Sequence, residues 1–113
     1  MHKTLVTMGS LVVFALMISA GPANAQDAKK GEQVYAAQKC SICHAIAGKG
    51  SKTNPLDGVG KKLSAADIKQ WIVNPTDMTA KAKSQKKPPM PNKYGKLPAA
   101  DIDGLVAYMQ SLK

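Results

Sequence analysis

Apolar residues recur at the three- and four-residue spacing of a helix in three segments of the chain, and no segment shows convincing strand alternation. The first predicted helix covers about residues 28–38, where Gly31, Val34 and Tyr35 follow this spacing and Asp27 can cap the first turn. Its apolar stripe is narrow, which favours close approach to another helix over a wide core face.

The second predicted helix has the clearest start in the sequence. Ser64 can cap the backbone of Asp67 while Asp67 reaches back, in the manner of a capping box. The helix should end near Asn74, because Pro75 disfavours a helical conformation in the residue before it.

The third predicted helix runs to the C-terminus, with Ile102, Leu105 and Met109 on its apolar face. Between the second and third helices, residues 76–96 lack consistent apolar spacing, and a cluster of prolines excludes a regular helix or central strand around Met90. We therefore expect an all-α domain with one shaped, proline-rich loop.

Residues 1–25 resemble a secretory signal peptide. Lys3 makes the start basic, residues 11–18 are an unbroken apolar run, and Ala23 and Ala25 give the small-x-small pattern before a cleavage site. A membrane anchor is the alternative, but eight apolar residues fall far short of the roughly 20 that span a bilayer. We expect export with cleavage after Ala25, which leaves residues 26–113 as the folded domain without stable membrane insertion.

The exported domain is small and basic. It keeps 88 residues, with 15 Lys against 7 acidic residues and no Arg, so its formal charge is +8. The length excludes a two-domain enzyme, and at this size a hydrophobic core is marginal without a disulfide, metal or prosthetic group. Aromatic residues are also scarce, at 4% of the chain, so a bound cofactor would relieve the shortage of core.

Cys40, Cys43 and His44 form a Cys-x-x-Cys-His motif, which is typical of c-type haem attachment. Two thiols at this spacing can add to the two vinyl groups of one porphyrin, and the tether then holds the adjacent imidazole beside the iron. After signal removal His44 is the only histidine in the domain.

Three alternatives to haem attachment fit the motif less well. A thioredoxin-like dithiol needs a βαβ setting that the pattern does not predict. A zinc site needs about four ligands, and this motif supplies three. A plain disulfide would close too short a loop to constrain the unfolded chain.

The second axial ligand of an attached haem would come from a methionine. Met109 lies on the apolar stripe of the last helix and is interpreted as a core residue, whereas Met78 follows Pro75 in a polar stretch. Met90 is favoured, because Pro89 and Pro91 fix the backbone around it and can present a weak thioether ligand rigidly.

Taken together, the predicted helices, the Cys-x-x-Cys-His motif and the methionine loop resemble a class I, His/Met-ligated bacterial cytochrome c over essentially the whole exported domain. The resemblance implies that Gly31 and Tyr35 cross a Leu-x-x-aromatic element of the last helix, Leu105 to Tyr108. It implies one haem c per chain, bound through Cys40 and Cys43 with iron between His44 and Met90.

The resemblance implies two further haem contacts. The loop at residues 54–60 is similar to one in which a proline carbonyl accepts the N–H of the proximal histidine, which assigns that role to Pro55. The segment at residues 71–75 is similar to a helix whose indole approaches a haem propionate, and core packing is the alternative for Trp71.

The implied function is that of a periplasmic electron carrier rather than an enzyme. Eleven of the 15 lysines fall between Lys49 and Lys96, a charge that suits redox partners with acidic docking surfaces. A monomer is expected, and nucleic-acid binding is not, since the chain has no Arg and no reading helix. Two alternatives stay open: a dedicated subunit of a periplasmic dehydrogenase, and a haem sensor or peroxidase-like protein with a displaceable Met ligand.

Overall fold

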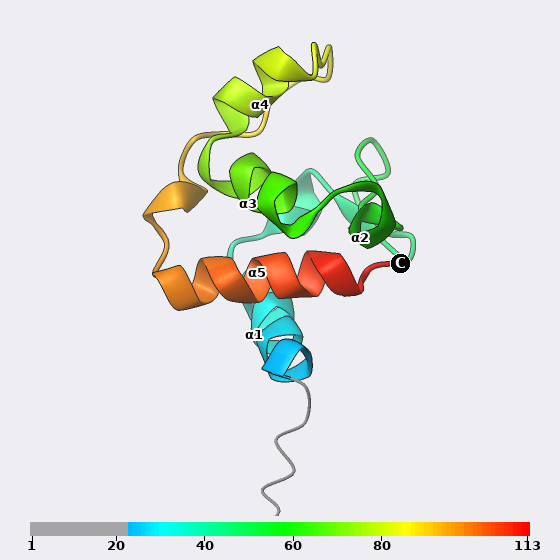
Figure 1. Cartoon of the computed structure of the whole chain (residues 1–113). Coiled ribbons are helices and arrows are strands. Elements are labelled where there is room, and N and C mark those ends of the chain that lie inside the picture. Colours follow the sequence, from blue (N-terminus) through cyan, green and yellow to red (C-terminus); the bar gives the residue numbers. More distant parts are fainter. Residues whose placement is uncertain (1–22) are drawn as a thin grey trace, which may run out of the picture.

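The computed structural model describes residues 23–113, which form a small helical domain and confirm the all-α expectation (Figure 1). The elements follow in the order α1 Ala23–Ala37, the 3-10 turn η1 Cys40–Ile42, β1 Ala45–Ile46, β2 Lys49–Gly50, α2 Val59–Lys62, α3 Ala65–Val73, α4 Pro75–Lys81, the 3-10 turn η2 Tyr94–Lys96 and α5 Ala99–Ser111. Within the described residues the two short strands form one antiparallel hairpin.

Two glycines allow α1 to cross α5, which lies in front of it in Figure 1. A Cβ atom on Gly31 would overlap the backbone carbonyl of Gly104 and would lie 2.7 Å from Cβ of Tyr108. The Tyr35 and Tyr108 rings meet edge to face at the same crossing, with centroids 5.8 Å apart. The predicted meeting of Gly31 and Tyr35 with the last helix is therefore confirmed, and Gly104 is a partner that the prediction did not include.

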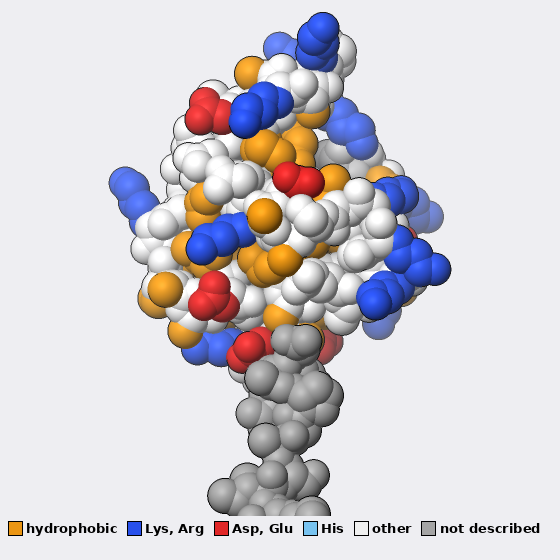
Figure 2. Space-filling view, in the orientation of Figure 1, with side chains coloured by type: hydrophobic (Ala, Val, Ile, Leu, Met, Phe, Trp, Pro, Cys, Tyr) orange, Lys and Arg blue, Asp and Glu red, His pale blue; other side chains and the backbone are white. Residues whose placement is uncertain are grey.

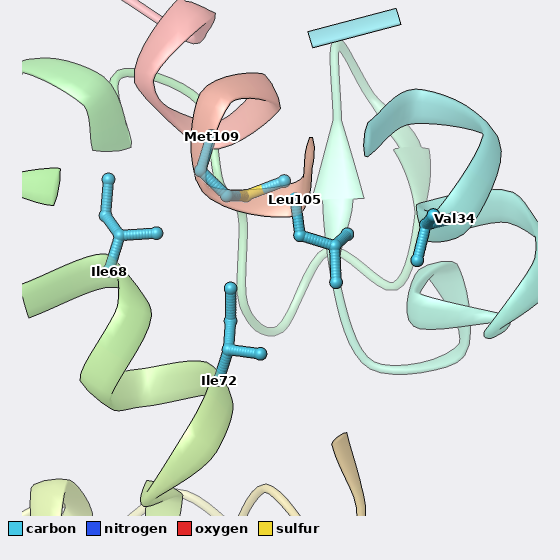
Figure 3. Packing of buried hydrophobic residues seen from close by; sticks show 5 residues of the cluster. All are labelled: Val34, Ile68, Ile72, Leu105 and Met109. Carbon is cyan, nitrogen blue, oxygen red and sulfur yellow. The ribbon is translucent and has the colours of Figure 1, made fainter. Parts of the chain in front are cut away.

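The core lies where α1, α3 and α5 meet. Its buried cluster, whose side chains converge in Figure 3, consists of Val34, Ile68, Ile72, Leu105 and Met109. Met109 is only 7% exposed, which confirms its prediction as a core residue. The α3 start is also confirmed, because the backbone N–H of Asp67 donates to Oγ of Ser64 at 3.1 Å.

Three sequence predictions of local structure differ from the fold. Helix α1 begins at Ala23 instead of residue 28, so Asp27 lies inside the helix and does not cap it. The segment expected to be irregular from residue 76 begins with α4, where Pro75 occupies the first turn, a position that needs no backbone N–H. The β1–β2 hairpin was not predicted, because strands of two residues carry no detectable alternation.

Almost all of the predicted signal peptide lies outside the described residues. Residues 1–22 are not described, and Ala23 to Ala25 begin α1. Cleavage after Ala25 stays a prediction. Among the described helices, none combines the length and apolar character that a membrane crossing requires.

Candidate haem-attachment site

The Cys-x-x-Cys-His segment folds as a tight turn directly after α1. Lys39 adopts a left-handed conformation with φ 56°, which ends the helical direction and starts η1. The N–H groups of Cys43 and His44 both donate to the carbonyl of Cys40, at 3.1 and 2.9 Å. Side chains three residues apart eclipse one another in a 3-10 turn, so the backbone places Cys40 and Cys43 on one side.

The end of the β1–β2 hairpin is hydrogen-bonded to this turn. The N–H of Ser51 donates to the carbonyls of Ser41 and His44, at 3.0 and 3.1 Å. Gly50 makes this approach possible, because its φ is +108° and a Cβ there would overlap the carbonyl of His44. The hairpin therefore fixes the backbone of the motif.

His44 is oriented by a backbone carbonyl. Its Nδ1 lies 3.1 Å from the carbonyl oxygen of Asn54. Since a carbonyl can only accept, the proton is on Nδ1 and the lone pair of Nε2 is left for a metal. Burial lowers the pKa of His44 below 6.5, with the Asn54 hydrogen bond acting in the opposite direction, so the neutral ligand form is favoured at neutral pH.

The resemblance implies Pro55 as the acceptor, whereas in the structure the acceptor is the carbonyl of the preceding residue, Asn54. Pro55 pairs with Ala45 in a parallel bridge, in which Asn54 accepts from the Ala45 N–H at 3.3 Å and Leu56 donates to the Ala45 carbonyl at 2.8 Å. Successive carbonyls of an extended chain point in opposite directions, so the Asn54 carbonyl faces the histidine and that of Pro55 faces away.

The two cysteines do not have the character of a redox dithiol. Both are free thiols, with Cys40 half-buried and Cys43 exposed. Burial raises the pKa of Cys40, whereas the attacking cysteine of a dithiol oxidoreductase has a lowered pKa. The zinc alternative also finds no support, since the described residues contain no group of three or more side chains suited to hold a metal ion.

The proline-rich loop closes on the attachment motif. Lys87 and Pro88 line a shallow pocket of about 80 Å³ together with Ile42, Cys43 and Asn54. One residue earlier, the ammonium of Lys86 donates to the Thr53 carbonyl at 3.2 Å. Residues 86–88, which shortly precede Met90, therefore lie beside Cys43 and Thr53.

The other candidate residues occupy different parts of the fold. Met90 is half-buried in the proline-rich loop, and Met78 is half-buried on α4. Trp71 is half-buried on α3, next to the core residue Ile72. Ligation by Met90 and a propionate contact by Trp71 both stay predictions.

Much of the apolar surface next to the core is only partly covered in the described residues. Eleven hydrophobic residues pack against the core while remaining only partly buried: Tyr35, Ile46, Leu56, Val59, Leu63, Val73, Tyr94, Leu97, Val106, Tyr108 and Leu112. These residues come from most elements of the fold, so the core of this small domain leaves apolar surface that a cofactor could cover. The donor set, two thiols and one neutral imidazole, matches covalent haem.

The hydroxyl of Tyr35 is buried and has no hydrogen-bond partner among the described residues. Burial is the main reason that the pKa of Tyr35 rises from 10.0 to about 12, with smaller contributions from Cys40, Tyr108 and Asp57. Folding favours the protonated phenol. The free energy of unfolding is therefore unaffected by this titration below pH 10 and falls as the pH rises toward about 12.

Tyr35→Phe is therefore expected to stabilise the protein and to weaken its alkaline sensitivity. Removing an unpartnered buried hydroxyl should raise the free energy of unfolding by about 1 kcal/mol at pH 7. Between pH 10 and 12 wild type should lose more stability than the variant. Urea unfolding followed by fluorescence of the single tryptophan, Trp71, measures both, and equal stability curves over this range would refute the assignment.

A family model described as Cytochrome c matches residues 28–113 of the chain. Searches of curated proteins and of solved structures found no match. The match begins inside α1, covers every later element and includes the whole Cys-x-x-Cys-His turn. The chain belongs to the cytochrome c family, as a class I c-type cytochrome, and so is a haem-binding electron-transfer protein.

The residues divide the work of holding this haem. Cys40 and Cys43 would supply the thiols for covalent attachment, and His44 would supply Nε2 while the Asn54 carbonyl holds its Nδ1 proton. When bound, the haem supplies a one-electron ferric/ferrous couple. The hairpin and the proline-rich loop both contact the motif.

Proposed function

We propose that the chain is a periplasmic carrier with one haem c, which moves single electrons between redox proteins after cleavage of residues 1–25. One observation carries the proposal: the N–H groups of Cys43 and His44 close a tight turn on the Cys40 carbonyl, and Nδ1 of His44 is held by a backbone carbonyl, which leaves Nε2 for iron. A single Cys-x-x-Cys-His motif supports one haem per chain.

Both axial positions are filled in the proposed carrier, by His44 and Met90. A thioether ligand together with burial favours the ferrous state and raises the reduction potential. With no open coordination position, an electron enters and leaves without breaking a bond. This arrangement supports a carrier over a haem sensor or peroxidase-like protein, in which an external ligand replaces the methionine.

The charge distribution supports partners with acidic docking surfaces. Lysine side chains gather over α4 and at the edge of the molecule near α2 (Figure 2). Opposite charges on a partner would steer encounter and accelerate association at low salt. We propose that the carrier is a monomer, binds no nucleic acid and is free in the periplasm rather than a fixed dehydrogenase subunit.

Replacing Met90 tests the ligand and the carrier function together. We expect wild type to show a low-spin spectrum with a sulfur-to-iron charge-transfer band, and Met90→Ala to lose that band while retaining covalent haem. Met78→Ala is the matched control, since Met78 is also half-buried, and it should keep the band. Survival of the band in Met90→Ala, or rapid carbon monoxide binding by reduced wild type, would contradict the proposal.

A further inference from the structure

Lys86 joins two segments that lie 33 residues apart in the chain. Its ammonium donates to the backbone carbonyl of Thr53 at 3.2 Å. Thr53 directly precedes Asn54, whose carbonyl holds Nδ1 of His44 at 3.1 Å. Lys86 itself lies in the proline-rich loop, shortly before Met90. One hydrogen bond therefore connects the segment that orients His44 with the loop that carries the proposed second ligand.

The backbone before Lys86 is fixed by the end of α4. The N–H of Lys83 donates to the carbonyl of Ala80 at 3.2 Å, and Lys83 has a left-handed φ of 50°. The N–H of Ser84 donates to the carbonyl of Thr79 at 3.1 Å, which completes the Schellman motif that ends many helices. Oγ of Ser84 then accepts the N–H of Lys86 at 3.3 Å. The side chain of Lys86 therefore starts from an ordered backbone, which lowers the entropy cost of its long-range bond.

The chain between Lys86 and Met90 is stiff. Pro88 and Pro89 lie between these two residues, and Pro91 follows Met90. Each proline ring fixes its own φ at about −65° and also restricts the residue before it. Few torsions in this stretch are left to absorb a movement, so the position of Lys86 affects the position of Met90.

Few other hydrogen bonds hold this part of the loop. α4 and the chain that follows it extend beyond α3, on the side away from α5 (Figure 1). After Met90, Oδ1 of Asn92 accepts the N–H of Thr76 at 3.5 Å, which ties the loop only to the first turn of α4. Within residues 23–113, the Lys86 bond is the only hydrogen bond between residues 82–91 and a segment other than α4. Regions with few such bonds open locally at a low free-energy cost, so this one bond has a large share in keeping the loop closed.

We propose that Lys86 is a positioning residue for the haem site. Its bond to the Thr53 carbonyl keeps the proline-rich loop against the segment that orients His44, and so limits how often an external ligand replaces Met90. This inference rests on the proposed ligation by Met90 and adds to it the residue that keeps the ligand loop in place.

Imidazole binding to the ferric, haem-loaded protein at pH 7 tests the role of Lys86, because imidazole reaches the iron only after Met90 has left it. Lys86→Leu removes the donor and is expected to raise the second-order rate constant of imidazole binding about fivefold, the net effect of one lost hydrogen bond. Lys86→Arg keeps a cationic donor and should stay close to the wild-type rate. An unchanged rate in Lys86→Leu would overturn the proposal.

Lys87→Leu is the matched control for charge. Lys87 is the next residue and is also exposed, and its ammonium has no hydrogen-bond partner in the described part of the chain. This variant should bind imidazole at the wild-type rate. Equal acceleration in Lys86→Leu and Lys87→Leu would show that the loss of positive charge, and not the bond to Thr53, controls imidazole entry, and the proposal would fall.

Ser64→Ala is the matched control for stability. It removes the cap of α3, at a cost of about the same size as the loss of the Lys86 bond, but lies outside the loop. It should lower the urea midpoint and leave the imidazole rate unchanged. If Ser64→Ala accelerates imidazole binding as much as Lys86→Leu, imidazole enters through general unfolding and Lys86 has no positioning role.

Failure of the ligation by Met90 has a separate signature. It appears as the absence of the Met90-dependent sulfur-to-iron band in wild type, and it would overturn this inference as well. Failure of the Lys86 role alone leaves that band in place and gives wild type and Lys86→Leu the same imidazole rate.

Discussion

Gly31→Ala is expected to destabilise the protein by at least about 3 kcal/mol, enough to leave much of the chain unfolded at 37 °C. The added methyl group would occupy the position of the Gly104 carbonyl and would press on Cβ of Tyr108. Both obstacles belong to the backbone or lie next to it, so a rotamer change cannot remove them. Relief requires α1 and α5 to separate, which exposes Val34 and Leu105 to water.

Alanine substitutions at two further glycines provide comparisons for this prediction. A Cβ on Gly104 would meet backbone atoms of α1 at 3.1–3.4 Å, so Gly104→Ala should cost clearly less than Gly31→Ala. Gly48 has open space around its Cβ position and φ +79°, so Gly48→Ala should cost only about 1 kcal/mol of backbone strain. Urea unfolding of the three haem-loaded variants measures the order, and a Gly31→Ala cost no larger than that of Gly48→Ala would reject the crossing geometry.

The helix pattern predicted that the first helix closely approaches another helix, and the resemblance to class I cytochromes c implied the last helix as its partner, but Gly104 was not expected in the contact. Gly31 stood out because it lies one turn before Tyr35 on a narrow apolar stripe. Gly104 lies inside the amphipathic pattern of the last helix, where a glycine costs about 1 kcal/mol relative to alanine unless close packing requires it. A glycine kept at position 104 in spite of this cost indicates a close contact. Which residues it contacts can be assigned only when the partner helix is known.

At the site, too, some features follow from the local sequence and others depend on pairing between distant segments. The spacing of Cys40, Cys43 and His44 is a local property, and the structure gives it the turn that haem attachment needs. The histidine acceptor depends instead on the register of a bridge between Ala45 and Pro55, and a one-residue error there exchanges the two carbonyls. Sequence patterns fix such a register poorly when the paired segments are as short as these.

Helix α4 was not predicted, for a different reason. The prolines at positions 88, 89 and 91 correctly exclude helix around Met90, but the expectation extended their influence back to residue 76. Pro75 lacks an N–H that the first turn does not need, and Met78 and Thr79 are the half-buried residues of the resulting seven-residue helix. A helix this short shows too little periodicity to be recognised in the sequence.

The double substitution Cys40→Ala/Cys43→Ala is expected to abolish covalent haem and with it cooperative folding. Only seven hydrophobic residues are buried in the described chain, while eleven more are covered in part. A haem that covers on the order of 300 Å² of this apolar surface contributes about 7 kcal/mol at ~25 cal/mol per Å². That contribution is comparable with the whole stability of a small domain, about 5–15 kcal/mol.

Near-ultraviolet circular dichroism and extraction into acidified organic solvent measure the two effects. The double variant should release all of its haem on extraction and should lack the tertiary aromatic signal of Tyr35 and Tyr108, whose rings pack edge to face. Cys43→Ala is the matched control, because one remaining thioether at Cys40 should retain both haem and fold. If the double variant instead unfolds cooperatively near the wild-type temperature without haem, the helices are self-sufficient and the haem is needed for electron transfer alone.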